Sequence, residues 1–283
     1  MKIRSLILAI FALIFTAKGV ASPCAAPSAL ANVAVPDHPF AAVATADNCW
    51  LFVSMDAGKG HGGIAVLHNQ GGNFGLDHVL ALQGAGNGES LSHDGRILAV
   101  SAGDDTTVLD VARLEHAAAD PLLGMFHSGK DAGAVYTAIS LDDKWLFVSD
   151  EGAQRISVFD LAKARSEGFS AAAPIGRVPM AIAPVGLALS PDGRWLYATS
   201  QVALPSLHLP AACNPENRNE RMHPAGLIFR IDVGKAVIDP SHAVLAALPA
   251  GCNPVRVAVS PSGGQLWVTA RGDNSLLRYQ IDA

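Results

Sequence analysis

Short stretches of alternating apolar and polar residues recur along the chain, and each is followed by a turn and a second apolar stretch. In residues 254–270 (PVRVAVSPSGGQLWVTA), valine occupies every second position from 255 to 259. Alternation with a period of two is typical of a β-strand that buries one face. The turn residues, here PSG and elsewhere combinations of Asp, Asn and Gly, supply the local hydrogen bonds and positive φ that a tight hairpin needs. The pattern therefore predicts β-hairpins.

Nearly the same stretch occurs at residues 184–200 (PVGLALSPDGRWLYATS), and three further copies are FAAVATADNCWLFVS (40–54), GESLSHDGRILAVS (88–101) and AVYTAISLDDKWLFVS (134–149). The leucines that align in the five copies are Leu51, Leu98, Leu146, Leu196 and Leu266, separated by 47, 48, 50 and 70 positions. A third apolar stretch follows in every copy, at 64–68, 107–111, 156–161, 227–233 and 276–281. A fourth, weaker one follows at 79–83, 122–126 and 243–248.

Four strands repeated at a period near 48 predict an all-β fold, a β-propeller of four-stranded antiparallel blades. Five blades are expected, beginning near residues 40, 88, 134, 184 and 254. The fifth copy ends after its third strand, and LANVAV (30–35) is a candidate for its fourth. Pairing 30–35 with 276–281 would close the ring and remove an open sheet edge. The alternatives are a ring with blades that this chain lacks, or a blade concealed in the long last interval.

The N-terminus has the pattern of an export signal. Lys2 and Arg4 precede an apolar run at 6–15, and small residues end at Ala21. We expect cleavage there, with 1–21 as the signal peptide and 22–283 as a single propeller domain. The apolar run is too short to span a bilayer, and the net charge of −5 without a basic run argues against nucleic acid as a partner. We expect a periplasmic or secreted monomer without membrane insertion.

Export makes the four cysteines expected disulfide partners, and four cysteines allow three pairings. The strand order decides between them. Cys213 and Cys252 fall on the face that carries the connections between blades, which we call the top. Cys24 and Cys49 fall on the opposite face, beside the hairpins that join first and second strands. The prediction is Cys24–Cys49 and Cys213–Cys252.

The repeats SPDGRWLYATS (190–200) and SPSGGQLWVTARGDNSLLRYQID (260–282) resemble the YVTN-type β-propellers, a group that includes propeller-fold lactonases and many secreted proteins. The resemblance covers the whole chain after the signal and implies the propeller fold. Members of that group usually have seven blades, so five is a departure. No local motif in this chain matches the catalytic residues of a lactonase.

Candidate site residues come from comparing the copies with one another. In the first strands, which should line the central channel, one position reads Ala41, Gly88, Tyr136, Gly186 and Arg256, and the next reads Ala42, Glu89, Thr137, Leu187 and Val257. Tyr136, Arg256 and Glu89 are polar residues in place of the small or apolar ones usual at these positions. His38, just before Pro39, should lie at the same mouth of the channel. Such a set could bind an anionic or sugar-like ligand. With Glu89 or His38 as general base and Arg256 polarising an ester carbonyl, it could open a lactone. The alternative is that Arg256 and Glu89 pair inside a wet channel.

The insertion at 201–224 is the largest departure from the repeat, and it carries His208 and His223 as ligand candidates. This insertion would form a lid over the channel or a protruding loop that binds a partner. The alternative is a solvent-exposed loop without a function of its own. His61, in the glycine-rich segment 58–63 (GKGHGG), is a further ligand candidate. The spacings of metal sites, covalent haem and hydrolase nucleophiles do not occur, so we expect neither a metal nor a cofactor.

Two main hypotheses follow. The first is an exported scaffold that binds a small ligand or a protein through its top face and central channel. The second is a lactonase-type hydrolase with its site at the channel mouth. A third, an accessory propeller of periplasmic redox metabolism, rests on analogy alone.

Overall fold

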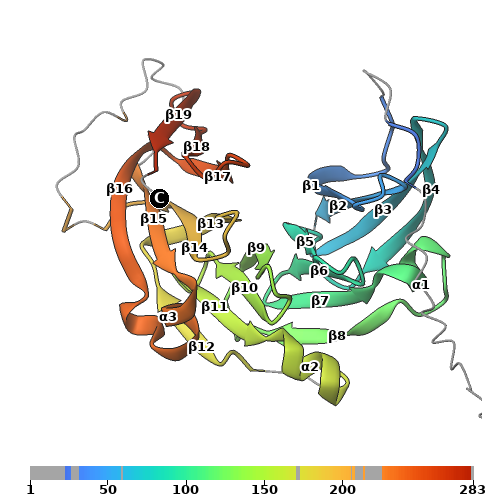
Figure 1. The fold of residues 1–283 in the computed structure, drawn as a ribbon, viewed down its shortest axis with the longest axis horizontal. Coiled ribbons are helices and arrows are strands. Elements are labelled where there is room, and N and C mark those ends of the chain that lie inside the picture. Colours follow the sequence, from blue (N-terminus) through green and yellow to red (C-terminus); the bar gives the residue numbers. More distant parts are fainter. Residues whose placement is uncertain are drawn as a thin grey trace, which may run out of the picture.

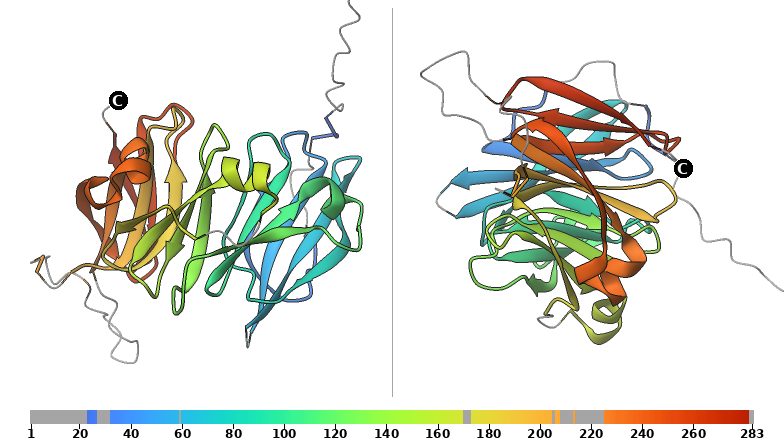
Figure 2. Two further views of the ribbon diagram at one scale, coloured as in Figure 1. Left: turned by 90° about the horizontal axis from the view of Figure 1, so that it is seen from below. Right: turned by 90° about the vertical axis from the view of Figure 1, so that its left-hand side faces the viewer.

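A computed structural model describes residues 23–26, 32–58, 60–169, 173–204, 206–207, 213 and 225–281. Its strands form five antiparallel sheets that stand side by side around an arc, each with its first strand nearest the axis (Figure 1). The predicted all-β propeller of five blades is therefore confirmed. Seen from the side, the sheets lie in one row, with the helices at the outer rim (Figure 2).

The elements follow the five repeats in order. Blade one contains β1 (His38–Ala44), β2 (Trp50–Gly58), β3 (His61–Gln70) and β4 (Asn73–Leu82). Blade two contains β5 (Glu89–Leu91), β6 (Ile97–Ala102), β7 (Asp105–Asp110), α1 (Val111–Glu115) and β8 (Leu122–His127). Blade three contains β9 (Ala134–Ile139), β10 (Trp145–Asp150), β11 (Arg155–Asp160), α2 (Leu161–Glu167) and β12 (Gly176–Pro179). Blade four contains β13 (Ile182–Leu189), β14 (Trp195–Val202), β15 (Ala225–Asp232), α3 (Val233–Ile238), η1 (Pro240–His242) and β16 (Val244–Cys252). Blade five contains β17 (Pro254–Val259), β18 (Gln265–Ala270) and β19 (Ser275–Gln280).

The hairpins between first and second strands share one hydrogen-bond pattern. In blade four, the hydroxyl of Ser190 accepts from the backbone N–H of Trp195 at 2.9 Å and donates to the carboxylate of Asp192. Hydroxyls at the equivalent positions accept the same bond in the other blades, from Thr45, Ser92, Ser140 and Ser260. The predicted turn residue has positive φ in every blade: Asn48, Gly95, Asp143, Gly193 and Gly263. The turn chemistry read from the sequence is thus confirmed.

Short helices follow three of the third strands, and the strand pattern did not predict them. Each is N-capped by an aspartate whose side chain accepts from a backbone N–H three residues on, as Asp160 does from Lys163 at 2.8 Å. The cap places an apolar residue directly after it, here Leu161, and a second three residues later, here Ala164. Both are buried against the preceding blade, so each helix fills the outer part of a junction between blades.

Buried apolar side chains join neighbouring blades. Between blades three and four, for example, Phe147 and Val158 pack with Leu196 and Phe229. Burial of each large side chain of this kind contributes about 1.5–3 kcal/mol. Near the axis, serine and threonine hydroxyls on second strands add hydrogen bonds to the next blade, as from Ser149 to the carbonyl of Val185 at 2.7 Å. No blade has a complete core of its own, which explains why the sequence repeats.

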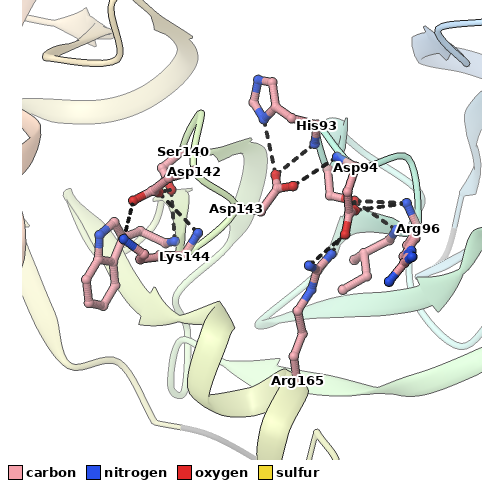
Figure 3. Close-up of polar contacts among 11 residues, drawn as sticks. His93, Asp94, Arg96, Ser140, Asp142, Asp143, Lys144 and Arg165 are labelled. Atoms are coloured by element: carbon pink, nitrogen blue, oxygen red, sulfur yellow. Dashed lines mark hydrogen bonds and ion pairs between the residues drawn. The ribbon is translucent and has the colours of Figure 1, made fainter. Parts of the chain in front are cut away.

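Polar contacts between hairpins also join blades two and three, on the edge opposite the top (Figure 3). The carboxylate of Asp143 accepts from the backbone N–H groups of His93 and Asp94 at 2.7 and 2.9 Å. Asp94 in turn forms a two-bond ion pair with Arg165 of α2, at 2.9 and 3.0 Å. Burial alone would raise the pKa of Asp94, but the Arg165 guanidinium and hydrogen bonds from Ser92 and Arg96 outweigh burial and lower the pKa to about 2.

The predicted closure of the ring is wrong. Blade five has three strands in the described residues, and β19 pairs only with β18. Residues 32–35, the described part of the candidate closing strand, form no strand. Instead, Val33 and Val35 pack on a cluster in blade one that contains Val53 and Met55. The arc is open between blades one and five (Figure 1).

The N-terminal segment therefore covers the free face of blade one, where a neighbouring blade would otherwise pack. Its attachment is specific: Cys24 forms a disulfide with Cys49, and its N–H donates to the carbonyl of Asp47 at 2.8 Å. The amide of Asn69 donates to the carbonyl of Ala25 at 2.8 Å. The segment predicted to close the ring thus contacts a sheet face, through Val33 and Val35, and not a sheet edge.

Both predicted disulfides are confirmed, Cys24–Cys49 and Cys213–Cys252. Among the described residues, no helix is long and apolar enough to cross a membrane. The predicted signal peptide, 1–21, lies outside the described residues.

Candidate functional site

The innermost strands bring side chains from three blades together at the axis. In β1 the pairing with β2 shifts between Pro39 and Ala41, so Phe40 is an extra residue, a β-bulge. A similar shift in β17 lies between Pro254 and Arg256. Bulges of this kind change the direction of neighbouring side chains. As a result, Phe40 of blade one reaches Arg256 of blade five.

Arg256 is the centre of this cluster. Its guanidinium carbon lies 4.6 Å from the centre of the Phe40 ring and 4.9 Å from that of Tyr136, on blade three. Its Nη2 donates to the carbonyl of Phe40 at 3.4 Å. Both rings present their faces to the cation, which is a stabilising arrangement. The structure thus brings Tyr136 and Arg256 together, and Phe40 completes the cluster.

The positive charge of Arg256 has no carboxylate partner among the described residues. Its Nη1 is buried and forms no hydrogen bond with any described residue. Burial lowers the pKa of Arg256; the proximity of Tyr136 opposes this effect and the charge of Arg271 adds to it. A half-buried guanidinium with unused donors attracts an anion.

Two glycines make room for these large residues. A β-carbon on Gly88 would lie 2.2 Å from Cδ2 of Tyr136, and one on Gly186 would lie 2.3 Å from the carbonyl oxygen of Val255, which precedes Arg256. In the sequence alignment of the blades, each glycine occupies the same position as its large neighbour in the next blade. The small residues are therefore the steric counterpart of the large ones.

Glu89 faces a different environment. It is 5% exposed, and one carboxylate oxygen accepts from the backbone N–H of Ser54, on blade one, at 3.3 Å. The other oxygen is buried without a hydrogen bond from any described residue. Burial raises the pKa of Glu89 well above its usual value, and the Ser54 hydrogen bond offsets only part of this increase. Glu89 forms no ion pair with Arg256, so the expected pairing of the two in the channel is wrong.

Neither of the two described histidine candidates, His38 and His61, forms a hydrogen bond with Arg256. His38 is exposed, and its ring nitrogen Nδ1 is 3.2 Å from the carbonyl of Asp56. His61 is the first residue of β3 and pairs with Gly58, the last residue of β2. His208 and His223 lie outside the described residues. Within the described part of the chain, no group of three His, Cys, Asp or Glu side chains could hold a metal ion.

A polar chain on the top face adds residues that the sequence did not indicate. Arg271, which follows β18, donates to the side chain of Gln201 at 3.4 Å, and Gln201 donates to Glu151 at 2.8 Å. These contacts join blades five, four and three. Arg271 lies close enough to Arg256 for its charge to lower the pKa of that residue. Because all three lie in or beside loops where the copies diverge, comparison between copies could not find them.

The fold and the central cluster define a β-propeller with an electropositive axial site, and solved structures agree on the fold. No family model and no curated protein matches the sequence. A hydrazine synthase from Kuenenia stuttgartiensis matches with 20% identity and a TM-score of 0.65, over 88% of this chain and 66% of that one. The periplasmic gluconolactonase PpgL of Pseudomonas aeruginosa matches with 19% identity and a TM-score of 0.64, over 88% and 68%. A putative 6-phosphogluconolactonase from Bacteroides fragilis matches with 19% identity and a TM-score of 0.59, over 84% and 65%.

At this level of identity the likeness shows the propeller fold alone. The chain spans about two thirds of the length of these proteins. Lactonase-like proteins are among its structural neighbours, as the sequence resemblance implied.

Proposed function

We propose that this protein is an exported propeller that binds a small anionic ligand, of the sugar-acid type, at the axial site. The observation that carries the proposal is Arg256: a half-buried guanidinium, without an ion-pair partner among the described residues, whose Nη1 makes no hydrogen bond there. A carboxylate or phosphate would satisfy this donor and the charge together. The rings of Phe40 and Tyr136 hold the guanidinium in place and offer apolar surface beside it.

Arg271 supports the same ligand class. Its charge acts on Arg256 with the same sign, so an anion between or beside the two guanidinium groups would relieve their repulsion. The hydrogen bonds from Arg271 to Gln201 and from Gln201 to Glu151 fix the loops around the site. Insertion residues that include His208 and His223 would add contacts from the top.

Two disulfides and the likeness to a periplasmic gluconolactonase support a location outside the cytoplasm. Residues 1–21 would then serve as the export signal, and 22–283 would act as one propeller domain and as a monomer.

The test is isothermal titration calorimetry at low ionic strength. It measures the affinity of the purified chain for gluconate, 6-phosphogluconate and inorganic phosphate. We expect Arg256→Gln to lower the affinity at least tenfold, the equivalent of about 1.4 kcal/mol. Arg278→Gln is the matched control because Arg278 also lies near an aromatic ring, that of Trp267, but on the exposed side of blade five. Equal affinity of wild type and Arg256→Gln would contradict the proposal.

Lactone hydrolysis is the second candidate. It is favoured by Glu89, a buried carboxyl of raised pKa on an inner strand, and by the gluconolactonases among the neighbours. In that reaction Glu89 or His38 would take a proton from water, which adds to the ester carbonyl while Arg256 polarises the carbonyl oxygen. The ring C–O bond of the lactone would then break, and its leaving oxygen would take up the proton held by Glu89 or His38. No described contact joins Glu89 or His38 to Arg256, so the geometry favours binding over hydrolysis. Gluconolactone hydrolysis at the spontaneous rate by both wild type and Arg256→Ala would exclude an enzyme.

A further inference from the structure

Blade five differs from the other four at its outer edge. In those blades the third strand pairs with a fourth: β3 with β4, β7 with β8, β11 with β12 and β15 with β16. In the described residues β19 has β18 on one side and no strand on the other. Among the described residues, the N–H and C=O groups on this outer edge of β19 therefore have no strand partner, and such groups readily accept another strand.

A groove of about 220 Å³ lies beside this edge, between blades four and five. Its lining is largely apolar and includes Ile228, Leu248, Leu266 and Tyr279. Leu248 is 50% exposed. At the junction between blades two and three, for example, the outer part is filled by Leu161 and Ala164 of α2, in the later blade, and by Phe126 of β8, the fourth strand of the earlier blade. The groove is the equivalent space at the last junction.

The polar groups in the groove indicate what would occupy it. The hydroxyl of Tyr197, a residue that is 3% exposed, and Nε of Arg230 are buried and have no hydrogen bond among the described residues. Arg230 lies 4.9 Å from the ring of Trp195, and Arg194 lies 4.5 Å from the same ring. Neither arginine forms an ion pair within the described part of the chain. Because Asp192 offsets the charge of Arg194, it is the guanidinium of Arg230, without an ion-pair partner among the described residues, that favours an acidic group in the occupant.

We propose that blade five accepts an extended segment of another protein, apolar at alternate positions and carrying an acidic residue, as its fourth strand. The backbone of the segment would pair antiparallel with β19, as β16 pairs with β15, and its apolar side chains would enter the groove. The acidic side chain would face Arg230. A second copy of this chain that pairs through its own β19 is a poorer occupant, because that strand (SLLRYQ) carries an arginine and no acidic residue that could face Arg230.

The probe is a fluorescent peptide that copies residues 239–249 (DPSHAVLAALP), which contain the start of β16, with glutamate in place of Ala247. Ala247 pairs with Phe229, which faces the preceding blade, so the glutamate would point into the groove. We expect this peptide to bind the full chain, and the version with glutamine at that position to bind at least threefold more weakly at low salt. We expect Arg230→Gln to abolish this difference between the two peptides.

Two exposed leucines provide a matched pair of variants. Leu248→Ser lies in the groove and is expected to weaken peptide binding at least fivefold. Leu276, which is 60% exposed on β19, points to the opposite face, so Leu276→Ser is expected to leave binding unchanged. Hydrogen exchange should show new protection in β19 when the peptide is bound.

Equal binding of a scrambled peptide, or protection that appears outside blades four and five, would overturn the proposal. A dimer in sedimentation that is lost on Leu248→Ser would overturn it as well, because a second copy would then occupy the groove.

Discussion

The ring of Tyr136 lies on the backbone of Gly88, so close that a β-carbon on residue 88 would approach Cδ2 of the ring to 2.2 Å. Tyr136 belongs to β9 and Gly88 directly precedes β5 of the neighbouring blade, and the N–H of Gly88 donates to the carbonyl of Val135 at 2.7 Å. The backbones are therefore fixed, and the ring cannot move away without leaving Arg256. The position of the axial site depends on this contact.

Gly88→Ala is expected to destabilise the fold by about 1–3 kcal/mol, the usual cost of an added methyl group in a packed region. Urea unfolding measures the change in the free energy of unfolding. Gly75→Ala is the matched control because a β-carbon there meets no atom within 4 Å. Tyr136→Ala in the Gly88→Ala background should recover part of the lost stability. Equal stability of Gly88→Ala and Gly75→Ala would refute the steric account.

The sequence predicted the blades well because strand alternation and turn chemistry are local. The positive φ at Asp143 and the hydroxyl bond of Ser190 follow from residues only a few positions apart. The disulfides were also predictable, because strand order alone assigns each cysteine to a face of the propeller. The three short helices were not, because Asp160 and Leu161 fit the end of a strand as well as a helix cap.

The site was predictable only in part, for a related reason. Comparison of the copies identified Tyr136 and Arg256, since each replaces a small residue. Phe40 was missed because its direction depends on a one-residue shift of pairing in β1, which no periodicity reveals. Glu89 was placed wrongly because neighbouring residues on a strand point to opposite faces, so that its side chain packs between blades and not toward Arg256. Closure failed because an apolar segment suits a sheet face as well as a sheet edge.

Glu89→Gln is expected to change how stability depends on pH. The folded state holds its carboxyl proton more tightly than the unfolded state, whose pKa is near 4.5. The contribution of Glu89 to the free energy of unfolding should therefore be fully present below pH 4.5 and be lost as the pH rises through the folded pKa. Glutamine cannot ionise, so the variant avoids the cost of a buried carboxylate. Its melting temperature should equal that of the wild type at pH 4 and exceed it at pH 8, by about 2–4 °C for each 1 kcal/mol regained.

Calorimetric melts between pH 4 and 8 measure this effect. Glu167→Gln serves as the control because Glu167 is an exposed glutamate on α2. If the melting temperatures of wild type and Glu89→Gln changed with pH in the same way, ionisation of Glu89 would not destabilise the folded state, and the prediction would be wrong.

The ion pair between Asp94 and Arg165 should produce the opposite dependence. The pKa of Asp94 in the folded protein, about 2, is below the usual 3.8. The contribution of this carboxylate to the free energy of unfolding is therefore present above pH 3.8 and is lost as the pH falls toward 2. Arg165→Gln should lower the free energy of unfolding at pH 7 by about 0.2–1 kcal/mol, because the pair is partly exposed. The difference from wild type should disappear near pH 2. Arg113→Gln, on the equivalent helix α1, has no ion pair to lose among the described residues, and it is the control in urea titrations at the two pH values.

The Cys24–Cys49 disulfide is expected to keep blade one covered. It closes a loop of 25 residues that includes Val33 and Val35, which pack on Val53 and Met55. Replacing both cysteines with serine should lower the free energy of unfolding by about 2–4 kcal/mol and should also let the N-terminal segment leave the sheet. Hydrogen exchange would then increase in β2 and β3 before global unfolding. Replacing Cys213 and Cys252 together should cost similar stability but leave exchange in blade one unchanged, since that disulfide is attached to blade four. If both pairs of replacements had the same effect on blade one, the N-terminal segment would not be its cover.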